Sequence, residues 1–295
     1  MREFAGRTAF VTGAASGLGL AMAEALAAEG MRIVATDVDG DALAAAAERL
    51  ERRNVPVLPL ELDVTDRDAF ADAGRRAVER FGGVHVLCNN AGVYRGGSLD
   101  AVTYGDWDWV LGVNVGGVVN GLQSILPLIR ASGEGGHVVN TASMAGLVGS
   151  SGMGVYNASK FAVVGLSEAL RADLAGQGVG VSVLCPGMVR TGILESERTR
   201  PAGLADAASD DAAAAQLSLM QLAMQTGIEA GEVGRLVVEG IREERFWLLT
   251  HPEMREMVAQ RDAELLGAFG EPDPERLARL EAFRASFAGD AGTGD

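Results

Sequence analysis

Short apolar runs alternate with longer segments of helical periodicity from the start of the chain to Thr191. Strands that are apolar throughout are typical of a parallel sheet covered by helices on both faces. Right-handed crossovers through the helices then predict an α/β fold, a single-domain, Rossmann-type, doubly wound parallel sheet. The expected strands are residues 8–11, 32–36, 57–62, 84–88, 137–140, 179–184 and 246–249, and the expected helices are 18–29, 41–53, 68–81, 103–130, 155–174 and 232–243.

The pattern loosens after Thr191. Residues 192–227 are rich in Ala, Ser, Asp and Met, and we interpret them as a mobile helical lid because a helix and a strand follow. From Pro252 the chain predicts two short amphipathic helices separated by residues 271–274, and then a frayed tail. The predicted organisation is a catalytic domain over residues 1–250, with its substrate lid, and a C-terminal helical extension and tail over residues 251–295.

The charge balance narrows the possible partners. The 295 residues carry a formal net charge of −15 and are 48% hydrophobic, which favours a folded acidic protein and argues against nucleic acid as a ligand. No run of 18 apolar residues and no apolar N-terminal signal is evident, so we expect a cytoplasmic protein with no membrane partner. Cys88 and Cys185 end apolar runs and are expected to be buried in strands. Three scattered histidines have no ligand spacing, so no metal site is expected.

A glycine-rich turn joins the first strand to the first helix. It reads Thr12-Gly13-Ala14-Ala15-Ser16-Gly17-Leu18-Gly19. Glycines let the backbone turn sharply and approach a pyrophosphate, which the positive end of the following helix attracts. The strict G-x-G-x-x-G spacing is absent, and a purely structural turn is the alternative. The position between strand and helix favours dinucleotide binding.

Asp37 ends the second strand, 18 residues after Gly19. A carboxylate there is placed to accept hydrogen bonds from the adenosine ribose and to repel a 2′-phosphate. Two unit charges ~4 Å apart repel by roughly 4 kcal/mol at an effective dielectric near 20. Val38 follows, so no adjacent arginine offsets that repulsion. The pattern favours NAD over NADP, the alternative being a solvated aspartate without a ligand.

Tyr156 and Lys160 lie four residues apart at the start of a predicted helix, so both side chains address one point. A free phenol titrates near pKa ~10, and an adjacent ammonium favours the phenolate. Lowering the phenol pKa by ~3 units needs about 4 kcal/mol. Lys160 is also the sole lysine of the chain, as expected for a site that needs a compact donor. Ser143, after a strand, is a candidate donor to a substrate oxygen.

These motifs together resemble the short-chain dehydrogenase/reductase family, from about Thr8 to Thr191 and more weakly to Thr250. The family's Asn-Asn-Ala-Gly motif corresponds to residues 89–92, and its Asp-Val pair to residues 63–64. The resemblance implies the catalytic set Asn114, Ser143, Tyr156 and Lys160. The cofactor-binding residues it implies are Gly13, Ser16, Gly17, Leu18, Gly19, Asp37, Asp63, Val64, Asn90, Ala91, Gly92, Tyr156, Lys160, Pro186, Gly187, Val189 and Thr191.

The family mechanism assigns a role to each member of that set. The resemblance implies that Tyr156 exchanges the hydroxyl proton while a hydride passes between substrate carbon and nicotinamide. Ser143 would orient the oxygen, Lys160 would lower the tyrosine pKa, and Asn114 would hold a water in a proton relay. The expected activity is therefore NAD-dependent interconversion of a secondary alcohol and its ketone. The alternatives are an NADP-dependent ketone reductase and a non-catalytic NAD-binding regulator, which would need neither Tyr156 nor Lys160.

Substrate and assembly are less strongly indicated. Residues 102–109 and 114–121 are similar to bacterial dehydrogenases that act on aryl secondary alcohols of lignin-type ethers, so a bulky or aromatic alcohol is expected. Leu217, Leu219, Met220, Leu222 and Met224 would give the lid an adaptable apolar face, although core or subunit contacts explain them equally well. Family members are usually tetramers or dimers, which implies a homo-oligomer, with the extension covering a neighbour or closing the substrate mouth.

Overall fold

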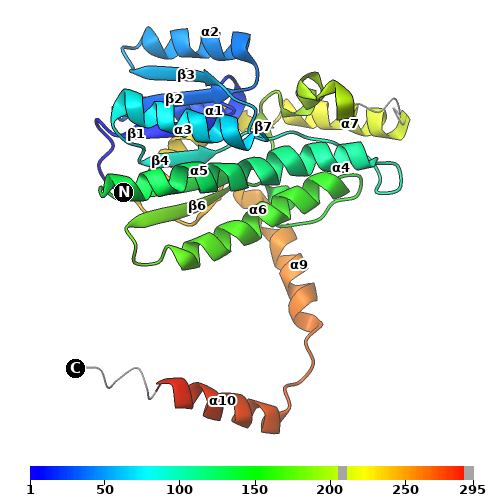
Figure 1. Cartoon of the computed structure of the whole chain (residues 1–295). Coiled ribbons are helices and arrows are strands. Elements are labelled where there is room, and N and C mark those ends of the chain that lie inside the picture. Colours follow the sequence, from blue (N-terminus) through cyan, green and yellow to red (C-terminus); the bar gives the residue numbers. More distant parts are fainter. Residues whose placement is uncertain (205–210, 289–295) are drawn as a thin grey trace, which may run out of the picture. The chain divides into compact units, whose positions relative to one another are not determined.

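The computed structural model describes residues 1–204 and 211–288 of the chain. Within them, seven parallel strands form one sheet in the order β3-β2-β1-β4-β5-β6-β9 (Figure 1). The strand order reverses between β1 and β4, so the loops after these two strands diverge and leave a crevice at the carboxyl edge. The predicted α/β fold is confirmed. The strands are β1 Thr8–Thr12, β2 Arg32–Asp37, β3 Val57–Glu61, β4 Val86–Asn89, β5 Gly136–Thr141, β6 Val179–Cys185 and β9 Trp247–Leu249.

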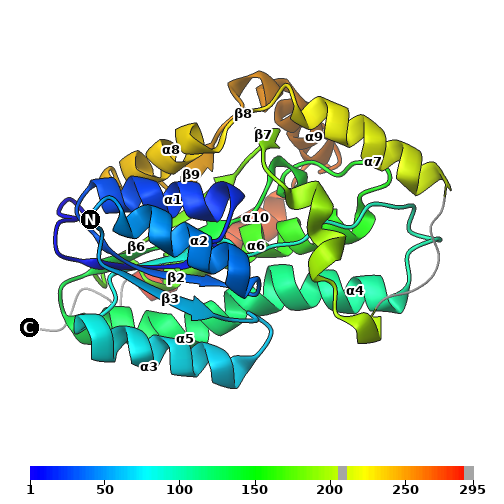
Figure 2. The same ribbon diagram turned by 90° about the horizontal axis from the view of Figure 1, so that it is seen from above.

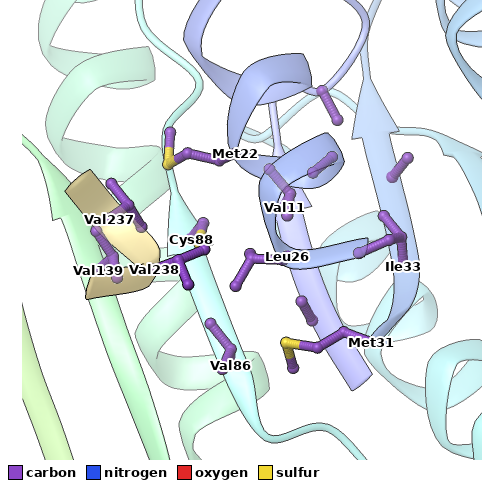
Figure 3. Packing of buried hydrophobic residues seen from close by; sticks show 14 of the residues in the cluster. Val11, Met22, Leu26, Met31, Ile33, Val86, Cys88, Val139, Val237 and Val238 are labelled. Atoms are coloured by element: carbon purple, nitrogen blue, oxygen red, sulfur yellow. The ribbon is translucent and has the colours of Figure 1, made fainter. Parts of the chain in front are cut away.

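Helices cover both faces of this sheet. Figure 2 shows α1 and α8 on one face and α3 and α5 on the other. Met22 and Leu26 of α1 are completely buried between the strands and Val237 of α8 (Figure 3). This packing explains the apolar strands, since neither face meets water. The helices are α1 Gly17–Ala28, α2 Gly40–Glu51, α3 Arg67–Phe81, α4 Tyr104–Leu111, α5 Gly117–Ser132, α6 Gly154–Asp173 and α8 Ala230–Arg242.

Helix α3 shows how local sequence sets these boundaries. Asp66 caps its N-terminus by accepting hydrogen bonds from the backbone of Asp68 and Ala69, at 3.0 and 2.9 Å. Gly82 ends the helix in the left-handed conformation, with φ of 85°, which glycine adopts without steric cost. Phe70 and Phe81 lie on its buried face. Capping, helical periodicity and the terminal glycine all agree with the sequence prediction.

One long helical stretch, Tyr104–Ser132, contains a π-helical turn at Gly112–Gly116 between α4 and α5. Its length and mean hydropathy of 1.3 are those of a membrane-spanning helix, and 44% of its most apolar window is buried inside the fold. Polar residues such as Asp106 and Asn114 interrupt the stretch, so it contains no run of 18 apolar residues. A single such helix, packed against a sheet, is weak evidence for a membrane span.

The segment after β6 contains features that the sequence did not indicate. β7 Val189–Arg190 pairs in parallel with β8 Ile228–Glu229, and two residues are too few for a periodic signal. Between them lie 3-10 turns at Ile193–Thr199 and Ala202–Leu204, and helix α7, Asp211–Met224. The described parts of residues 192–227 are therefore largely helical, and their role as a substrate lid stays a prediction. Residues 205–210 of the expected lid lie outside the described residues.

A second unit begins after Pro252. It contains α9, Arg255–Gly267, and α10, Pro274–Ala288, which confirms the two predicted helices. Pro274 is the first residue of α10, where its missing N–H and fixed φ suit a helix start. The expected frayed tail, residues 289–295, lies outside the described residues.

Candidate active site

A cavity of about 380 Å³ opens at the carboxyl edge of the sheet, where the strand order reverses. Of the residues expected to bind cofactor, every one except Gly19 lines it. Ser143, Tyr156 and Lys160 line the same cavity. The tertiary structure thus brings together loops from β1, β2, β3, β4, β5 and β6 that are far apart in sequence.

The glycine turn has the shape that a pyrophosphate needs. Gly13 and Gly17 have φ of 65° and 52°, in the left-handed region. A Cβ on Gly13 would lie 3.0 Å from the Ala91 Cα, and one on Gly19 would lie 1.9 Å from the Gly13 carbonyl oxygen. Gly19 therefore allows close packing of the turn, while Gly13 and Gly17 face the cavity. Ser16 precedes α1 and makes no capping bond through its side chain. These observations fit a dinucleotide phosphate at the helix N-terminus.

Thr12 joins the glycine turn to the Asn-Asn-Ala-Gly loop. Its Oγ1 accepts hydrogen bonds from the backbone N–H groups of Asn90 and Ala91, at 2.9 and 3.0 Å. The Asn90 side chain donates back to the Thr12 carbonyl at 3.0 Å. The two loops that flank the crevice are thereby held at a fixed separation. This contact explains why a threonine and an asparagine accompany the glycines.

Asp37 faces the cavity beside Val38, as expected. Its Oδ2 accepts from the Ala15 N–H at 3.0 Å and its Oδ1 from the Asp39 N–H at 3.1 Å, so the carboxylate also supports the glycine turn. The expectation that no arginine lies near is wrong in three dimensions. Arg198 lines the same cavity and its guanidinium binds Asp39 at 2.7 Å, from 159 residues away. Only the folded chain brings this cation close.

Tyr156 and Lys160 both project from the first turns of α6. Lys160 is only 3% exposed, whereas Tyr156 is partly buried and lines the cavity. The ammonium donates to the Thr141 carbonyl at 3.0 Å and lies 5.6 Å from the centroid of the Tyr156 ring. Burial raises the pKa of Tyr156 to about 12, an effect that a hydrogen bond with Ser143 partly opposes and Tyr94 increases. Burial also lowers the pKa of Lys160 to about 8.

These pKa directions correct one expectation from the sequence. The phenol was expected to be acidified by its neighbouring ammonium, but the cost of burying the phenolate is larger in this structure. The Lys160 proton points to Thr141. Spacing on a helix established that the two side chains lie close, but their exposure depends on the surrounding loops.

Ser143 follows β5 and contacts the loop after β6. Its hydroxyl donates to the Pro186 carbonyl at 3.3 Å and accepts from the Ala145 N–H at 3.1 Å. With Tyr156 it forms a pair of hydroxyl groups at the wall of the cavity. Such a pair is suited to bind one substrate oxygen.

Asn114 lies behind this pair, in the π-helical turn, and does not line the cavity. Its Oδ1 accepts from the Val93 N–H at 2.8 Å, while its Nδ2 donates to the Val93 carbonyl and to Ser159 Oγ, both at 3.0 Å. A Cβ on Gly92 would lie 3.3 Å from the Asn114 Oδ1 and 3.5 Å from the Lys160 Nζ. Gly92 therefore lets the amide approach the ammonium. A π-helical turn at such a point is common at functional sites.

The sequence analysis missed several residues around this centre. Tyr94 packs edge-on against Tyr156, with ring centroids 5.2 Å apart, and its hydroxyl lies 3.0 Å from the Met220 sulfur. Leu204 lines the cavity, as do two residues of segments that the sequence did single out, Trp109 of residues 102–109 and Met224 of the expected lid face. The proposed apolar lid face is partly wrong, because Leu219 and Leu222 are 69% and 63% exposed. A helix without a continuous apolar stripe gave no signal for which side faces inward.

Asp106 forms an ion-pair centre that was also missed. It is 1% exposed and accepts from Arg95 Nε at 2.9 Å and from Arg200 Nη1 at 2.8 Å. It also completes a capping box with Thr103 at the start of α4. The segment containing Arg200 is thus attached to α4. Only the capping spacing was visible in the sequence.

Comparisons with known proteins agree with this geometry. The sequence model of the short chain dehydrogenase family matches residues 7–202. A C alpha-dehydrogenase of Sphingobium sp. (strain NBRC 103272 / SYK-6) is 34% identical over 291 residues, covering 97% of this chain and 94% of its own.

Two crystal structures are also similar. A short chain dehydrogenase/reductase from Burkholderia phymatum in complex with NAD has a TM-score of 0.89 and 42% identity, over 93% of this chain and 99% of its own. The apo form of LigO from Sphingobium sp. strain SYK-6 has a TM-score of 0.80 and 35% identity, over 97% and 98% of the two chains. The chain belongs to the short-chain dehydrogenase/reductase family and is an oxidoreductase.

Proposed function

We propose that this protein is an NAD-dependent dehydrogenase that interconverts a bulky or aromatic secondary alcohol and its ketone. One observation carries the proposal: Ser143, Tyr156 and Lys160 line the same cavity as the glycine turn and Asp37. A regulator that only binds dinucleotide would require the glycine turn without a pair of hydroxyl groups beside it in the cavity. NADP-dependent ketone reduction is the second candidate, favoured by the position of Arg198.

The bound nicotinamide would accept the hydride in oxidation and supply it in reduction. In oxidation, the alcohol oxygen lies between the hydroxyls of Ser143 and Tyr156, and Tyr156 takes its proton as the carbon loses a hydride. In reduction, Tyr156 returns the proton to the oxygen of the new alcohol. Ser143 donates to the oxygen as charge develops on it. Lys160 would hold positive charge beside the phenol and would be available to bind the nicotinamide ribose, and Asn114 would position this part of the site.

NAD is supported as the cofactor by Asp37 and by the Burkholderia relative, whose structure contains NAD. A 2′-phosphate beside Asp37 would meet a carboxylate that backbone N–H groups hold in place. Arg198 lies close but is paired with Asp39, which reduces the positive charge it offers. Catalytic efficiency measured with both dinucleotides distinguishes the two cofactors.

The substrate class is supported by the cavity wall and by the relatives. Val93, Trp109, Val113, Leu204 and Met224 give an apolar surface beside the hydroxyl pair. The relatives include a protein named C alpha-dehydrogenase and LigO, both from the same Sphingobium strain. Aryl secondary alcohols are therefore the first substrates to test, ahead of steroid and sugar alcohols. We further propose that the enzyme acts in the cytoplasm as a homo-oligomer, a tetramer or a dimer.

Tyr156→Phe tests the mechanism. It removes the proton-transfer group with little change in shape, and we expect kcat to fall by about 10²–10⁴-fold, the usual contribution of general acid–base catalysis. The assay follows the absorbance of reduced nicotinamide with the best alcohol of the panel. Tyr104→Phe is the matched control, because Tyr104 is 89% exposed and does not line the cavity. Full turnover by Tyr156→Phe would refute the mechanism, and activity confined to sugars would refute the substrate class.

A further inference from the structure

Thr250 and His251 lie immediately after the last strand of the sheet, at the edge that carries the cavity. β6 and β9 pair in parallel with Cys185 opposite Leu249, so the residues that follow the two strands come together. Pro186 and Gly187 follow β6 and line the cavity. In the sequence His251 is one of three scattered histidines to which no role could be assigned. In the folded chain His251 is only 8% exposed and contacts Gly187 in the loop that follows β6.

A single peptide unit connects these residues to Ser143. The Gly187 N–H donates to Thr250 Oγ1 at 3.1 Å and to His251 Nδ1 at 3.2 Å. The carbonyl of the same peptide unit belongs to Pro186, and it accepts from Ser143 Oγ at 3.3 Å and from the Met144 N–H at 2.9 Å. The plane of the Pro186–Gly187 peptide is thus fixed from both sides.

The chemistry of the imidazole fixes its tautomer. Because Nδ1 accepts from the Gly187 N–H, it carries no proton, and the neutral ring keeps its proton on Nε2. Thr250 Oγ1 lies 2.6 Å from the same Nδ1, so its hydroxyl is the donor between the two. A Cβ on Gly187 would lie 2.7 Å from His251 Cγ. The ring therefore packs directly against the glycine, and any larger residue would displace it.

We propose that Thr250 and His251 are positioning residues that orient the Pro186–Gly187 peptide, and through it the Ser143 hydroxyl and the loop that faces nicotinamide. They act through backbone groups and touch no reacting atom. The Ser143 hydroxyl has one proton, and the Pro186 carbonyl determines where that proton points before substrate arrives. Small errors in such geometry are costly, since a misplacement of about 1 Å can lower a rate by about 100-fold.

The test separates orientation from general stability. His251→Leu and Thr250→Val each leave the Gly187 N–H with one acceptor instead of two. Each single variant is expected to lower kcat/KM by about 10-fold, and the double variant is expected to lower kcat/KM by more than the product of the single effects. His251→Asn and Thr250→Ser keep an acceptor in place and are expected to recover most of the activity. His85→Leu is the matched control, because the buried His85 Nδ1 accepts from the N–H of Thr8, the first residue of β1, at 3.1 Å at the opposite edge of the sheet.

The readouts are kcat and KM for the alcohol, the Kd of NADH from fluorescence, and Tm. This inference rests on the proposed dehydrogenase activity for its kinetic part, whereas NADH binding tests the loop without turnover. We expect the His251→Leu and Thr250→Val variants to bind NADH more weakly and turn over more slowly than His85→Leu at a similar Tm. Effects within twofold of those of His85→Leu would overturn the proposal, as would failure of His251→Asn and Thr250→Ser to recover activity. If the double variant does not fold, the single variants decide by the same criterion.

Discussion

At the scale of single residues, desolvation disfavours the charged forms of Tyr156 and Lys160. Burial raises the pKa of Tyr156 to about 12 and lowers the pKa of Lys160 to about 8, so at neutral pH the phenol is neutral and the lysine still carries its proton. A phenol with a raised pKa is a ready acid and a poor base. Reduction of a ketone uses the form that the site already holds. Oxidation of an alcohol requires a compensating positive charge in the cavity.

This balance predicts how Tyr156 ionises. In the protein without dinucleotide, the Tyr156 phenol is expected to titrate above the pKa of ~10 of a free phenol, and addition of NAD should lower its midpoint because the oxidised ring is cationic. Since oxidation uses the phenolate, its rate should rise with pH up to that midpoint. The measurement is tyrosinate absorbance of the wild type minus that of Tyr156→Phe, with and without NAD. A midpoint at or below the free-phenol value of ~10 before NAD is added would contradict the prediction.

Asp37 carries a second prediction at this scale. Asp37→Asn removes the charge but keeps an acceptor for the glycine turn, so the preference for NAD over NADP should fall by at least about tenfold; the full repulsion of roughly 4 kcal/mol is partly screened by salt. Adding Arg198→Ala to that variant should weaken NADP use again, because an arginine that lines the same cavity is lost. Catalytic efficiency with both dinucleotides gives the answer. An unchanged preference would show that the Asp37 charge does not select the cofactor.

At the scale of elements, the buried carboxylate of Asp106 joins α4 to the segment that carries Ser196 and other residues of the cavity wall. The Asp106 carboxylate of α4 forms an ion pair with Arg200, which follows the 3-10 turn at Ile193–Thr199. The guanidinium carbon of Arg200 also lies 5.2 Å from the centroid of the Trp109 ring. The 3-10 turn at Ile193–Thr199 contributes Ser196, whose hydroxyl accepts from the Tyr94 N–H at 3.1 Å. The first part of the expected lid is therefore tied to the domain by polar contacts.

Asp106→Asn is expected to loosen this attachment. The substitution removes the negative charge that Arg95 and Arg200 share, and we expect the free energy of unfolding to fall by about 3 kcal/mol. This value is at the lower end of the usual range because Arg95 is 22% exposed. We expect a lower Tm and a rise in the KM of the alcohol that exceeds any rise in the KM of NAD. Asp72→Asn is the control, since Asp72 forms an exposed pair with Arg75. Equal effects of both variants on the KM of the alcohol would refute the role of Asp106.

At the scale of the whole molecule, the sheet unit ends at Pro252 and contains every residue of the proposed chemistry. The second unit contains helices with exposed apolar side chains. Leu265 and Leu266 lie near the end of α9, and Phe269 follows the helix. Exposed apolar groups of this size are typical of surfaces that associate. We therefore connect the second unit with oligomer formation.

Truncation after Pro252 tests this connection. The shortened chain is expected to keep its fold and its NADH binding, because the sheet and cavity are complete, but to form a smaller oligomer. Light scattering gives the mass and circular dichroism the fold. Leu265→Glu with Leu266→Glu in the full chain provides a variant without deletion. An unchanged oligomer mass in both proteins would exclude the second unit from the subunit interface.

The sequence by itself determined the layered sheet, the glycine turn, Asp37 and the pair on α6, because each depends on spacing within one element or one loop. Right-handed crossovers predicted a doubly wound sheet, whereas the strand order, and with it the meeting of loops at the crevice, came from the fold. Periodicity also located the main helices. Two-residue strands such as β7 were missed because no period can be read from two residues.

Only the tertiary structure decided which distant groups meet. Arg198 reaches Asp39, Arg200 reaches Asp106, and His251 reaches Gly187 across long separations in the chain. The pKa of Tyr156 belongs to this class too, because it depends on how completely neighbouring loops exclude water from a phenol that the sequence placed correctly. Contacts within an element are set by its period, whereas contacts between elements and the burial they produce exist only once the chain has folded.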